Sequence, residues 1–301
     1  MDRIGFIGLG VMGQPMAMHL GEKIIPMGKD LLLFDLDRSR AEGVLSHLGQ
    51  GEGKRIRIAR DLADFSETEL IFLSLPVSSI VKETVLNLVQ PVRPNCIIVD
   101  TSTTEVETVK ALAEDLSNRG IDFFDAPVSG GEKAAKEGTL SFMVGGREES
   151  FTLIQPFLLA MGASAVYMGG PGAGQTAKAV NQIIVGAAFT AIAESFSLGV
   201  QCGLDPRTLY DAIKGGWAGS KVLDVAAQDM LDRSFKPGGT VDIHWKDLGY
   251  ALSLAKDTDT PVPLTALVHE VFKAARAKGE GQKSQSAVVR LWEDLLNIEV
   301  K

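Results

Sequence analysis

The chain has 301 residues, more than one hydrophobic core comfortably holds, so two domains are expected. Its 30 basic and 38 acidic residues give a net charge of −8, which argues against nucleic acid as a partner. The two cysteines and four histidines show neither a disulfide framework nor a metal-ligand spacing. We expect no secretory signal, because residues 1–3 lead directly into an apolar run that ends in glycines, and we therefore expect a cytoplasmic protein.

The first half of the chain alternates short apolar runs with amphipathic stretches. Helix-like segments such as residues 14–20 and 104–119 separate several of the apolar runs. This alternation predicts an α/β domain with a doubly wound parallel sheet, a Rossmann fold. The strands are predicted at residues 4–7, 31–34, 70–74, 97–100, 122–125 and 141–144.

The second half shows helical patterns only, with no convincing strand. A glycine cluster at residues 169–174 separates the alternating pattern from the helical pattern. We therefore predict a Rossmann domain over 1–169 and an all-helical domain over 170–301. A long helix over about 175–202 joins them. Its apolar stretch contains Asn181, Gln182 and Glu194, which favours a buried helix over a membrane span. Further helices are predicted at 205–213, 220–230, 245–257, 264–277 and 284–296.

A glycine turn follows the first predicted strand. Gly8, Gly10 and Gly13 have the G-x-G-x-x-G spacing and precede a helix-like stretch. In such a turn one glycine allows the tight bend, one lets the backbone approach a pyrophosphate, and one permits close packing of helix and strand. The helix N-terminus then offers N–H groups to the phosphates. The turn, which includes Val11 and Met12, therefore predicts a dinucleotide site; a purely structural turn is the alternative.

Asp35 ends the second predicted strand. A carboxylate there accepts hydrogen bonds from the adenine ribose and repels a 2′-phosphate, which favours NAD over NADP. Its distance along the chain from the glycine turn is longer than the roughly 20 residues expected, and we attribute the excess to an inserted loop over residues 21–30. Arg38 and Arg40 could still bind a phosphate, so NADP stays open.

Two polar groups could carry chemistry. Lys178, Asn181 and Gln182 are spaced i, i+3, i+4 and share one helix face, where a lysine could donate a proton to a carbonyl or bind a carboxylate. The spacing alone fits an ordinary amphipathic helix better, because such polar pairs are common. Ser129-Gly130-Gly131 follows a predicted strand and could offer a hydroxyl and backbone N–H groups to an anion, or form a simple turn.

These motifs together resemble those of the β-hydroxyacid dehydrogenases. The matching pieces span nearly the whole chain, and its C-terminal half resembles the tartronate semialdehyde reductases of that family through segments 215–220, 222–224 and 232–238. The matching motifs are Gly5 to Gly13 with Pro15-Met16-Ala17, Asp125 to Gly131, Gly138-Thr139-Leu140, Met143 to Gly146, Gly172-Ala173-Gly174 with Lys178, Asn181 and Gln182, and Lys246-Asp247-Leu248.

The resemblance implies a role for each site residue. Lys178 would be the catalytic lysine. The substrate would be held by Ser129, Gly130 and Gly131 at its carboxylate and by Asn181 and Gln182. Leu75, Pro76 and Thr103 would line the cofactor cleft, and Lys246 would reach the cofactor from the helical domain. Two positions depart from the family pattern. Val77 replaces a frequent asparagine, and Trp217, which either shapes the substrate pocket or packs between helices, replaces a smaller residue.

The implied function is an NAD(P)-dependent oxidoreductase that interconverts a small 3-hydroxy acid and its semialdehyde, foremost tartronate semialdehyde and D-glycerate. A dehydrogenase of 3-hydroxyisobutyrate or a related acid is the alternative, and Lys178 argues against an imine reductase. From a different class, a non-catalytic dinucleotide-binding module remains open. We expect a homodimer or homotetramer formed through the helical domain, with no metal and no membrane partner.

Overall fold

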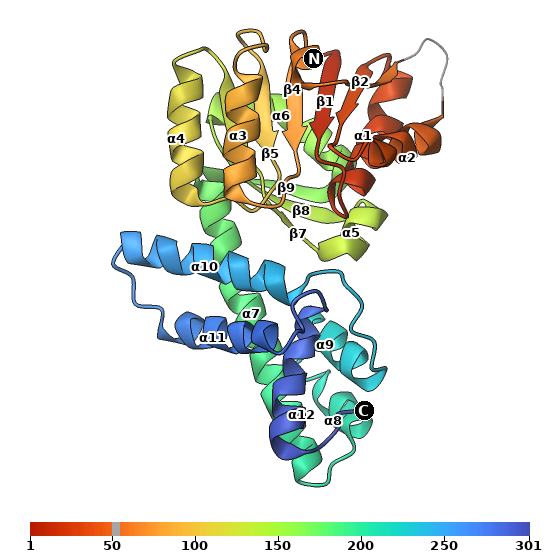
Figure 1. Ribbon diagram of the computed structural model, residues 1–301, viewed down its shortest axis with the longest axis vertical. Coiled ribbons are helices and arrows are strands. Elements are labelled where there is room, and N and C mark those ends of the chain that lie inside the picture. Colours follow the sequence, from red (N-terminus) through yellow and green to blue (C-terminus); the bar gives the residue numbers. More distant parts are fainter. Residues whose placement is uncertain (50–54) are drawn as a thin grey trace. The chain divides into compact units, whose positions relative to one another are not determined.

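The computed structural model describes residues 1–49 and 55–301 and divides into two compact units, Met1–Lys178 and Ala179–Lys301 (Figure 1). The division falls inside helix α7 (Ala173–Gln201), so the first turns of α7 belong to the first unit. The predicted domain boundary between residues 169 and 170 stays a prediction.

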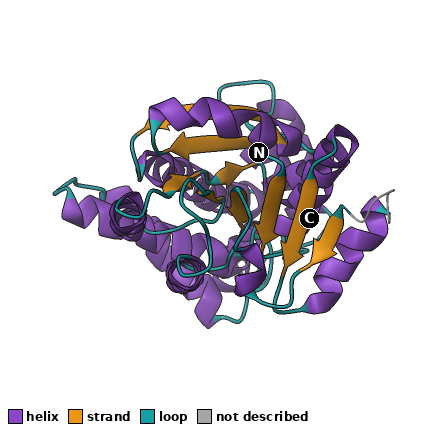
Figure 2. Ribbon diagram, turned by 90° about the horizontal axis from the view of Figure 1, so that it is seen from above, coloured by secondary structure: helices purple, strands orange, loops and turns teal. Residues whose placement is uncertain are grey.

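The first unit is built on one sheet. Its strands, orange in Figure 2, run in the order β3-β2-β1-β4-β5-β6-β8-β7, with β9 paired to β8. From β3 to β6 every neighbouring pair is parallel, which confirms the predicted Rossmann architecture. The strands are β1 (Arg3–Ile7), β2 (Asp30–Phe34), β3 (Ile56–Ile58), β4 (Leu70–Leu73), β5 (Ile97–Asp100), β6 (Asp122–Asp125), β7 (Val128–Ser129), β8 (Leu140–Gly145) and β9 (Gly162–Gly169).

The sheet departs from the prediction at one end, where β8 runs antiparallel to both β6 and β7. All six predicted strands form, but β3, β7 and β9 were missed. β3 and β7 have only three and two residues, too few for a periodic pattern. β9 is rich in small residues and mostly half-exposed, and its pairing with β8 is a long-range contact that no local pattern reveals.

Helices cover both faces of the sheet. α1 (Gly13–Ile24), α2 (Arg38–Leu48) and α6 (Glu148–Met161) share a core with Phe6 and Phe72, whereas α3 (Ser78–Leu88) and α4 (Val106–Ser117) pack with their sequence neighbours on the opposite face. α4 shows why: its buried residues recur every three or four positions, which gives one apolar stripe. The stripe consists of Val106, Val109, Leu112 and Leu116. The short α5 (Gly131–Glu137) and the 3₁₀ turns η1 (Ile25–Met27) and η2 (Leu62–Phe65) complete the unit.

The prediction of an inserted loop at residues 21–30 is wrong. Helix α1 continues through Gly21 to Ile24, and η1 follows it directly. Leu20 and Ile24 are both buried, and a Cβ on Gly21 would collide with Leu48 of α2. Gly21 therefore lets two helices approach closely and does not end α1, so the longer spacing before Asp35 comes from additional helix.

The second unit is all-helical, as predicted. Three of its helices begin at a capping side chain: Asp205 accepts from Thr208 N (2.8 Å), Ser220 from Leu223 N (3.1 Å) and Thr240 from Ile243 N (3.2 Å). Besides the rest of α7, the unit contains α8 (Pro206–Ile213), α9 (Lys221–Leu231), α10 (Val241–Asp257), α11 (Pro263–Ala277), the 3₁₀ turn η3 (Gln285–Val289) and α12 (Arg290–Leu296).

Helix α7 is long and apolar enough to cross a membrane by length and composition alone. One such helix is weak support for a membrane span, because a core helix of a soluble protein meets the same criteria. Only 39% of its most apolar window is buried. Val180, Ile184 and Leu198 are among its exposed apolar residues, so α7 is less buried within this chain than the sequence predicts.

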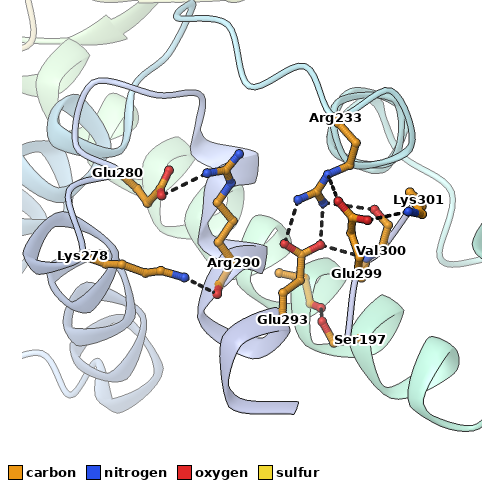
Figure 3. Close-up of polar contacts among 10 residues, drawn as sticks. Ser197, Arg233, Lys278, Glu280, Arg290, Glu293, Glu299, Val300 and Lys301 are labelled. Carbon is orange, nitrogen blue, oxygen red and sulfur yellow. Dashed lines mark hydrogen bonds and ion pairs between the residues drawn. The ribbon is translucent and has the colours of Figure 1, made fainter. Parts of the chain in front are cut away.

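An ion-pair cluster holds the C-terminal residues against the second unit (Figure 3). Arg233 binds both carboxylate oxygens of Glu293, at 2.5 and 3.1 Å, and Glu299 at 3.3 Å. Glu293 also accepts from Val300 N at 2.8 Å, and the carbonyl of Val300 accepts from Arg233. Val300 is fully buried, so one carboxylate joins α12, the turn after α9 and the C-terminal segment.

Glu293→Gln removes the charge at the centre of this cluster and keeps the shape of the side chain. We expect it to lower the free energy of unfolding by about 2 kcal/mol, less than for a fully buried pair because Arg233 is 27% exposed. Urea unfolding followed by circular dichroism measures the loss. Glu299→Gln is the matched control on the same arginine, with a much smaller expected loss because Glu299 is exposed to solvent. Equal losses in the two variants would contradict the central role of Glu293.

Candidate functional site

The glycine turn Gly8-Leu9-Gly10-Val11-Met12-Gly13 lies between β1 and α1, at the carboxyl end of the central strand. Gly8 has a positive φ of 90° and donates its N–H to Phe34 O at 2.9 Å. α1 begins without a side-chain cap at Met12, which leaves the start of the helix accessible to an anionic ligand. Val11 is 60% exposed at the tip of the turn.

Each glycine of the turn has its own steric reason. A Cβ on Gly13 would overlap the carbonyl oxygen of Gly8, and a Cβ on Gly8 would overlap that of Ser74. At Gly10 the nearest atom to such a Cβ is Nη1 of Arg40, at 3.8 Å. The fold therefore requires Gly8 and Gly13, whereas Gly10 leaves open space beside the backbone. That is the arrangement expected if a pyrophosphate approaches Gly10.

Asp35 directly follows β2 and lies beside this turn. Its carboxylate accepts from Leu9 N at 2.6 Å and from Asp37 N at 2.8 Å, and its side chain is only 10% exposed. Arg40 places Nη1 3.7 Å from the same carboxylate. The predicted ribose acceptor and a candidate phosphate ligand thus lie together at the glycine turn.

The loops after β4 and β5 carry three more of the predicted cofactor residues, Leu75, Pro76 and Thr103. Leu75 N donates to Ser102 Oγ at 2.8 Å, which ties the Leu75-Pro76 loop to the loop that holds Thr103. Asp100, fully buried at the end of β5, accepts from Ser102 N at 2.9 Å and from Thr104 Oγ1 at 2.6 Å. Asp100 therefore holds both neighbours of Thr103, Ser102 through its backbone and Thr104 through its side chain.

Lys178 lies next to the predicted substrate loop. Its Nζ donates to the carbonyl oxygen of Val128 at 2.9 Å, one residue before Ser129. Gly130 and Gly131 follow with φ values of 131° and 69°, which favour glycine. The structure thus brings a buried lysine together with the Ser129-Gly130-Gly131 loop, as the sequence predicts.

Two residues near Lys178 were missed by sequence reasoning. Asp125, the fully buried last residue of β6, accepts from Gly172 N at 2.9 Å and from Gln175 N at 2.7 Å. Burial raises the pKa of Asp125 to about 7, opposed by these two hydrogen bonds and reinforced by the negative charge of Asp100. Gln175 is also buried, one turn before Lys178. The sequence pointed to Asp125 only as the first residue of the family motif Asp125 to Gly131, and it gave no indication of its hydrogen bonds to the start of α7.

The remaining predicted residues belong to the second unit. Gln182 donates to Asp247 Oδ2 at 2.7 Å and lies 3.4 Å from His244 Nδ1, while Asn181 donates to Gln182 Oε1 at 2.9 Å. Lys246 Nζ lies 3.3 Å from Asp247 Oδ1. Asn181, Gln182 and Lys246 therefore meet in one polar cluster around the buried Asp247, which the sequence did not place at its centre.

Trp217, one of the two departures from the family pattern, stands on the loop between α8 and α9. Its side chain is fully exposed, at 107% of the reference area. The alternative that Trp217 packs between helices is therefore wrong for this chain.

Two family models together cover most of the chain. Residues 3–170 match the NAD binding domain of 6-phosphogluconate dehydrogenase, and residues 172–292 match the domain described as NAD-binding of NADP-dependent 3-hydroxyisobutyrate dehydrogenase. The 2-(hydroxymethyl)glutarate dehydrogenase of Eubacterium barkeri is 35% identical over 99% of this chain and 97% of its own length. The 2-hydroxy-3-oxopropionate reductase of Escherichia coli K12 is 35% identical over 98% of each chain. The chain belongs to the β-hydroxyacid dehydrogenase family.

The solved structures agree with this assignment. The 3-hydroxyisobutyrate dehydrogenase of Mycobacterium tuberculosis, studied with L-serine, is 29% identical and superposes with a TM-score of 0.86 over 97% of this chain and 99% of its own. As a β-hydroxyacid dehydrogenase, the chain is an oxidoreductase that uses NAD or NADP. The open side of Gly10 and the carboxylate of Asp35 fit the pyrophosphate and the ribose of such a dinucleotide.

Two alanine variants separate the structural glycine from the one that faces the ligand. Gly10→Ala introduces a methyl group into open space, so we expect an unchanged melting temperature but at least about tenfold weaker NADH binding. Gly13→Ala would force apart the turn and α1, so we expect it to lower both the melting temperature and the affinity. Thermal unfolding and NADH fluorescence titration measure the two effects. Full NADH affinity in Gly10→Ala would rule out close approach of the cofactor at this glycine.

Proposed function

We propose that the chain interconverts a small 3-hydroxy acid and its semialdehyde, with tartronate semialdehyde and D-glycerate as the first candidate pair. The observation that carries this proposal is the position of Lys178. Its Nζ lies 2.9 Å from Val128 O, beside the Ser129-Gly130-Gly131 loop, so the proposed proton donor and the proposed anion-binding loop lie next to each other in one unit. A reaction that reduces a carbonyl close to a carboxylate needs that pair of groups.

In the proposed reaction the nicotinamide cofactor, when bound, supplies or accepts the hydride. Lys178 donates a proton to the carbonyl oxygen, and its positive charge stabilises the developing alkoxide. Ser129 and the N–H groups of Gly130 and Gly131 hold the substrate carboxylate, which fixes the carbonyl for transfer. In the reverse direction a neutral Lys178 accepts the hydroxyl proton. Asn181 and Gln182 are also proposed to bind the substrate.

The choice of substrate rests on chemistry shared by two relatives. The names 2-hydroxy-3-oxopropionate and 2-(hydroxymethyl)glutarate both describe a carboxylate whose neighbouring carbon bears the formyl or hydroxymethyl group that reacts. The resemblance of segments 215–220 and 232–238 to the tartronate semialdehyde reductases favours the smaller acid. A dehydrogenase of 3-hydroxyisobutyrate or of 2-(hydroxymethyl)glutarate is the second candidate.

A steady-state panel tests the substrate and the cofactor together. We expect the highest kcat/KM for tartronate semialdehyde with NADH, ahead of the reverse assays with 3-hydroxyisobutyrate and 2-(hydroxymethyl)glutarate. NADPH should perform worse, because Asp35 repels a 2′-phosphate, although Arg40 beside it limits the difference. Higher kcat/KM with one of the other acids would replace the proposed substrate, and turnover with none would favour a non-catalytic module.

Lys178→Ala tests the catalytic role. We expect kcat to fall about 10³-fold, within the range for loss of general acid–base catalysis, while the affinity for NADH stays nearly unchanged. Stopped-flow turnover and NADH titration provide the two values. Lys133→Ala, which removes a highly exposed lysine from α5, is the control and should retain full activity. Activity near that of the unmodified enzyme in Lys178→Ala would exclude the proposed role.

We also propose a homodimer formed through the second unit, with a homotetramer as the alternative. Val180, Ile184 and Leu198 are exposed on α7, and their spacing places them on one helix face. A monomer that exposed this apolar stripe would be disfavoured in water. Light scattering should give a dimeric or tetrameric mass, and Ile184→Glu should lower it. A monomeric mass for the unmodified chain at micromolar concentration would refute the proposal.

A further inference from the structure

The first turn of α7 is joined to the end of β6 by one carboxylate. Asp125 accepts from Gly172 N and Gln175 N with different oxygens, Oδ1 at 2.9 Å and Oδ2 at 2.7 Å. Both donors belong to the start of α7, where backbone N–H groups have no partner within the helix. A carboxylate in that position also interacts favourably with the positive end of the helix dipole.

Two motif glycines make room for this carboxylate. A Cβ on Gly145 of β8 would lie 2.5 Å from Asp125 Oδ1, and one on Gly174 of α7 would lie 2.9 Å from Asp125 Oδ2. Neither glycine has the positive φ that would demand glycine by conformation. Their small size therefore serves the close contact of α7, β8 and the Asp125 side chain.

Gln175 extends the connection to the cofactor side of the first unit. Its Oε1 accepts from Thr104 N at 3.1 Å, and its Nε2 donates to Ser102 O at 2.8 Å. These bonds flank Thr103, and Ser102 in turn accepts from Leu75 N. A continuous chain of hydrogen bonds thus runs from the Leu75 loop, through Ser102 and Gln175, to the helix turn that precedes Lys178.

We propose that Asp125 and Gln175 are positioning residues that hold Lys178 in register with the substrate loop and the cofactor loops. The proposal rests on the catalytic role proposed for Lys178. We call Asp125 and Gln175, with their hydrogen bonds, the clamp. Gln175 lies three residues before Lys178 on α7, so the clamp fixes the helix turn next to the lysine. Asp125 lies three residues before Val128, whose carbonyl accepts from Lys178 Nζ. The position of the acceptor segment and the position of the lysine's helix therefore both depend on Asp125.

Burying a charged carboxylate at Asp125 is energetically unfavourable, and this supports a functional reason for its position. Full burial next to Asp100 disfavours the charged form of Asp125, yet two N–H groups require two acceptors at that position. An asparagine would fit the same space but would turn an amide N–H toward one of the two donors. A small fixed displacement of a catalytic group is enough to cost a large part of the rate.

Asp125→Asn and Gln175→Met test the clamp, with Thr176→Val as the matched control. The control removes a hydrogen bond at the same helix start, from Thr176 Oγ1 to Gly172 O at 2.8 Å, and leaves both clamp residues intact. We expect Gln175→Met and Asp125→Asn to lower kcat at least about tenfold and Thr176→Val to leave kcat unchanged. Gln175→Met keeps the test valid if Asp125→Asn fails to fold.

A second readout does not depend on turnover. Competitive labelling of lysines with acetic anhydride, read by mass spectrometry, reports how well Lys178 is held relative to the exposed Lys133 of the same molecule. In both clamp variants we expect labelling of Lys178 to accelerate about fivefold relative to Lys133, as local order is lost. A purely structural role would lower the melting temperature without this selective change.

The outcomes separate the two proposals. If Lys178→Ala abolishes turnover but the clamp variants keep normal kcat and normal Lys178 labelling, the positioning role is overturned and the proposed function stands. A lower kcat with unchanged Lys178 labelling also overturns it. If Lys178→Ala retains turnover, the proposed function fails, and labelling alone decides the positioning: selective acceleration supports it and unchanged labelling overturns it.

Discussion

The carboxylate of Asp125 binds the backbone at the start of α7, and the arrangement of the first unit around Lys178 depends on that contact. Parallel strands bring their carboxyl ends to one edge of the sheet, where the loops after β1, β4, β5 and β6 gather. A sheet edge alone leaves those loops without a fixed relation to a following helix. Asp125, with Gln175 behind it, supplies that relation through backbone hydrogen bonds whose geometry tolerates little variation.

At the same edge of the sheet, different acidic side chains order different loops. Asp100 orders the loop around Thr103, and Asp35 orders the glycine turn through Leu9 N. Each of these acids uses its carboxylate on main-chain donors near a strand end. The first unit therefore uses side chain to backbone hydrogen bonds to order the loops that follow these strands.

Much of this could be predicted from the sequence, because local patterns report local structure. Short runs rich in apolar residues predicted six strands, and the glycine spacing after the first of them predicted the turn at Gly8. The contact of Lys178 with the segment before the Ser129-Gly130-Gly131 loop followed from family motifs and not from helical spacing, which favoured an ordinary solvated lysine. The spacing of polar residues along one helix cannot indicate a contact between Lys178 and Val128, which lie 50 positions apart in the sequence.

What the sequence could not supply were contacts between segments distant in the chain. Gly21 looked like a helix end because glycine disfavours helix interiors, but the close approach of Leu48 outweighs that preference. Gln182 looked like one of three residues on a single helix face, yet its amide binds Asp247 of α10. β9 forms because β8 pairs with it, not because its own residues favour a strand.

The exposure of Trp217 has a practical consequence for spectroscopy. The chain has three tryptophans, and the other two are partly buried: Trp245 stacks on His269 with Arg276 over its ring, and Trp292 packs on the helical core. A water-soluble collisional quencher will therefore reach the Trp217 indole far more often than the other two. The unmodified enzyme carries its own optical reporter on the α8–α9 loop, and any molecule that covers this loop will shield that indole from the quencher.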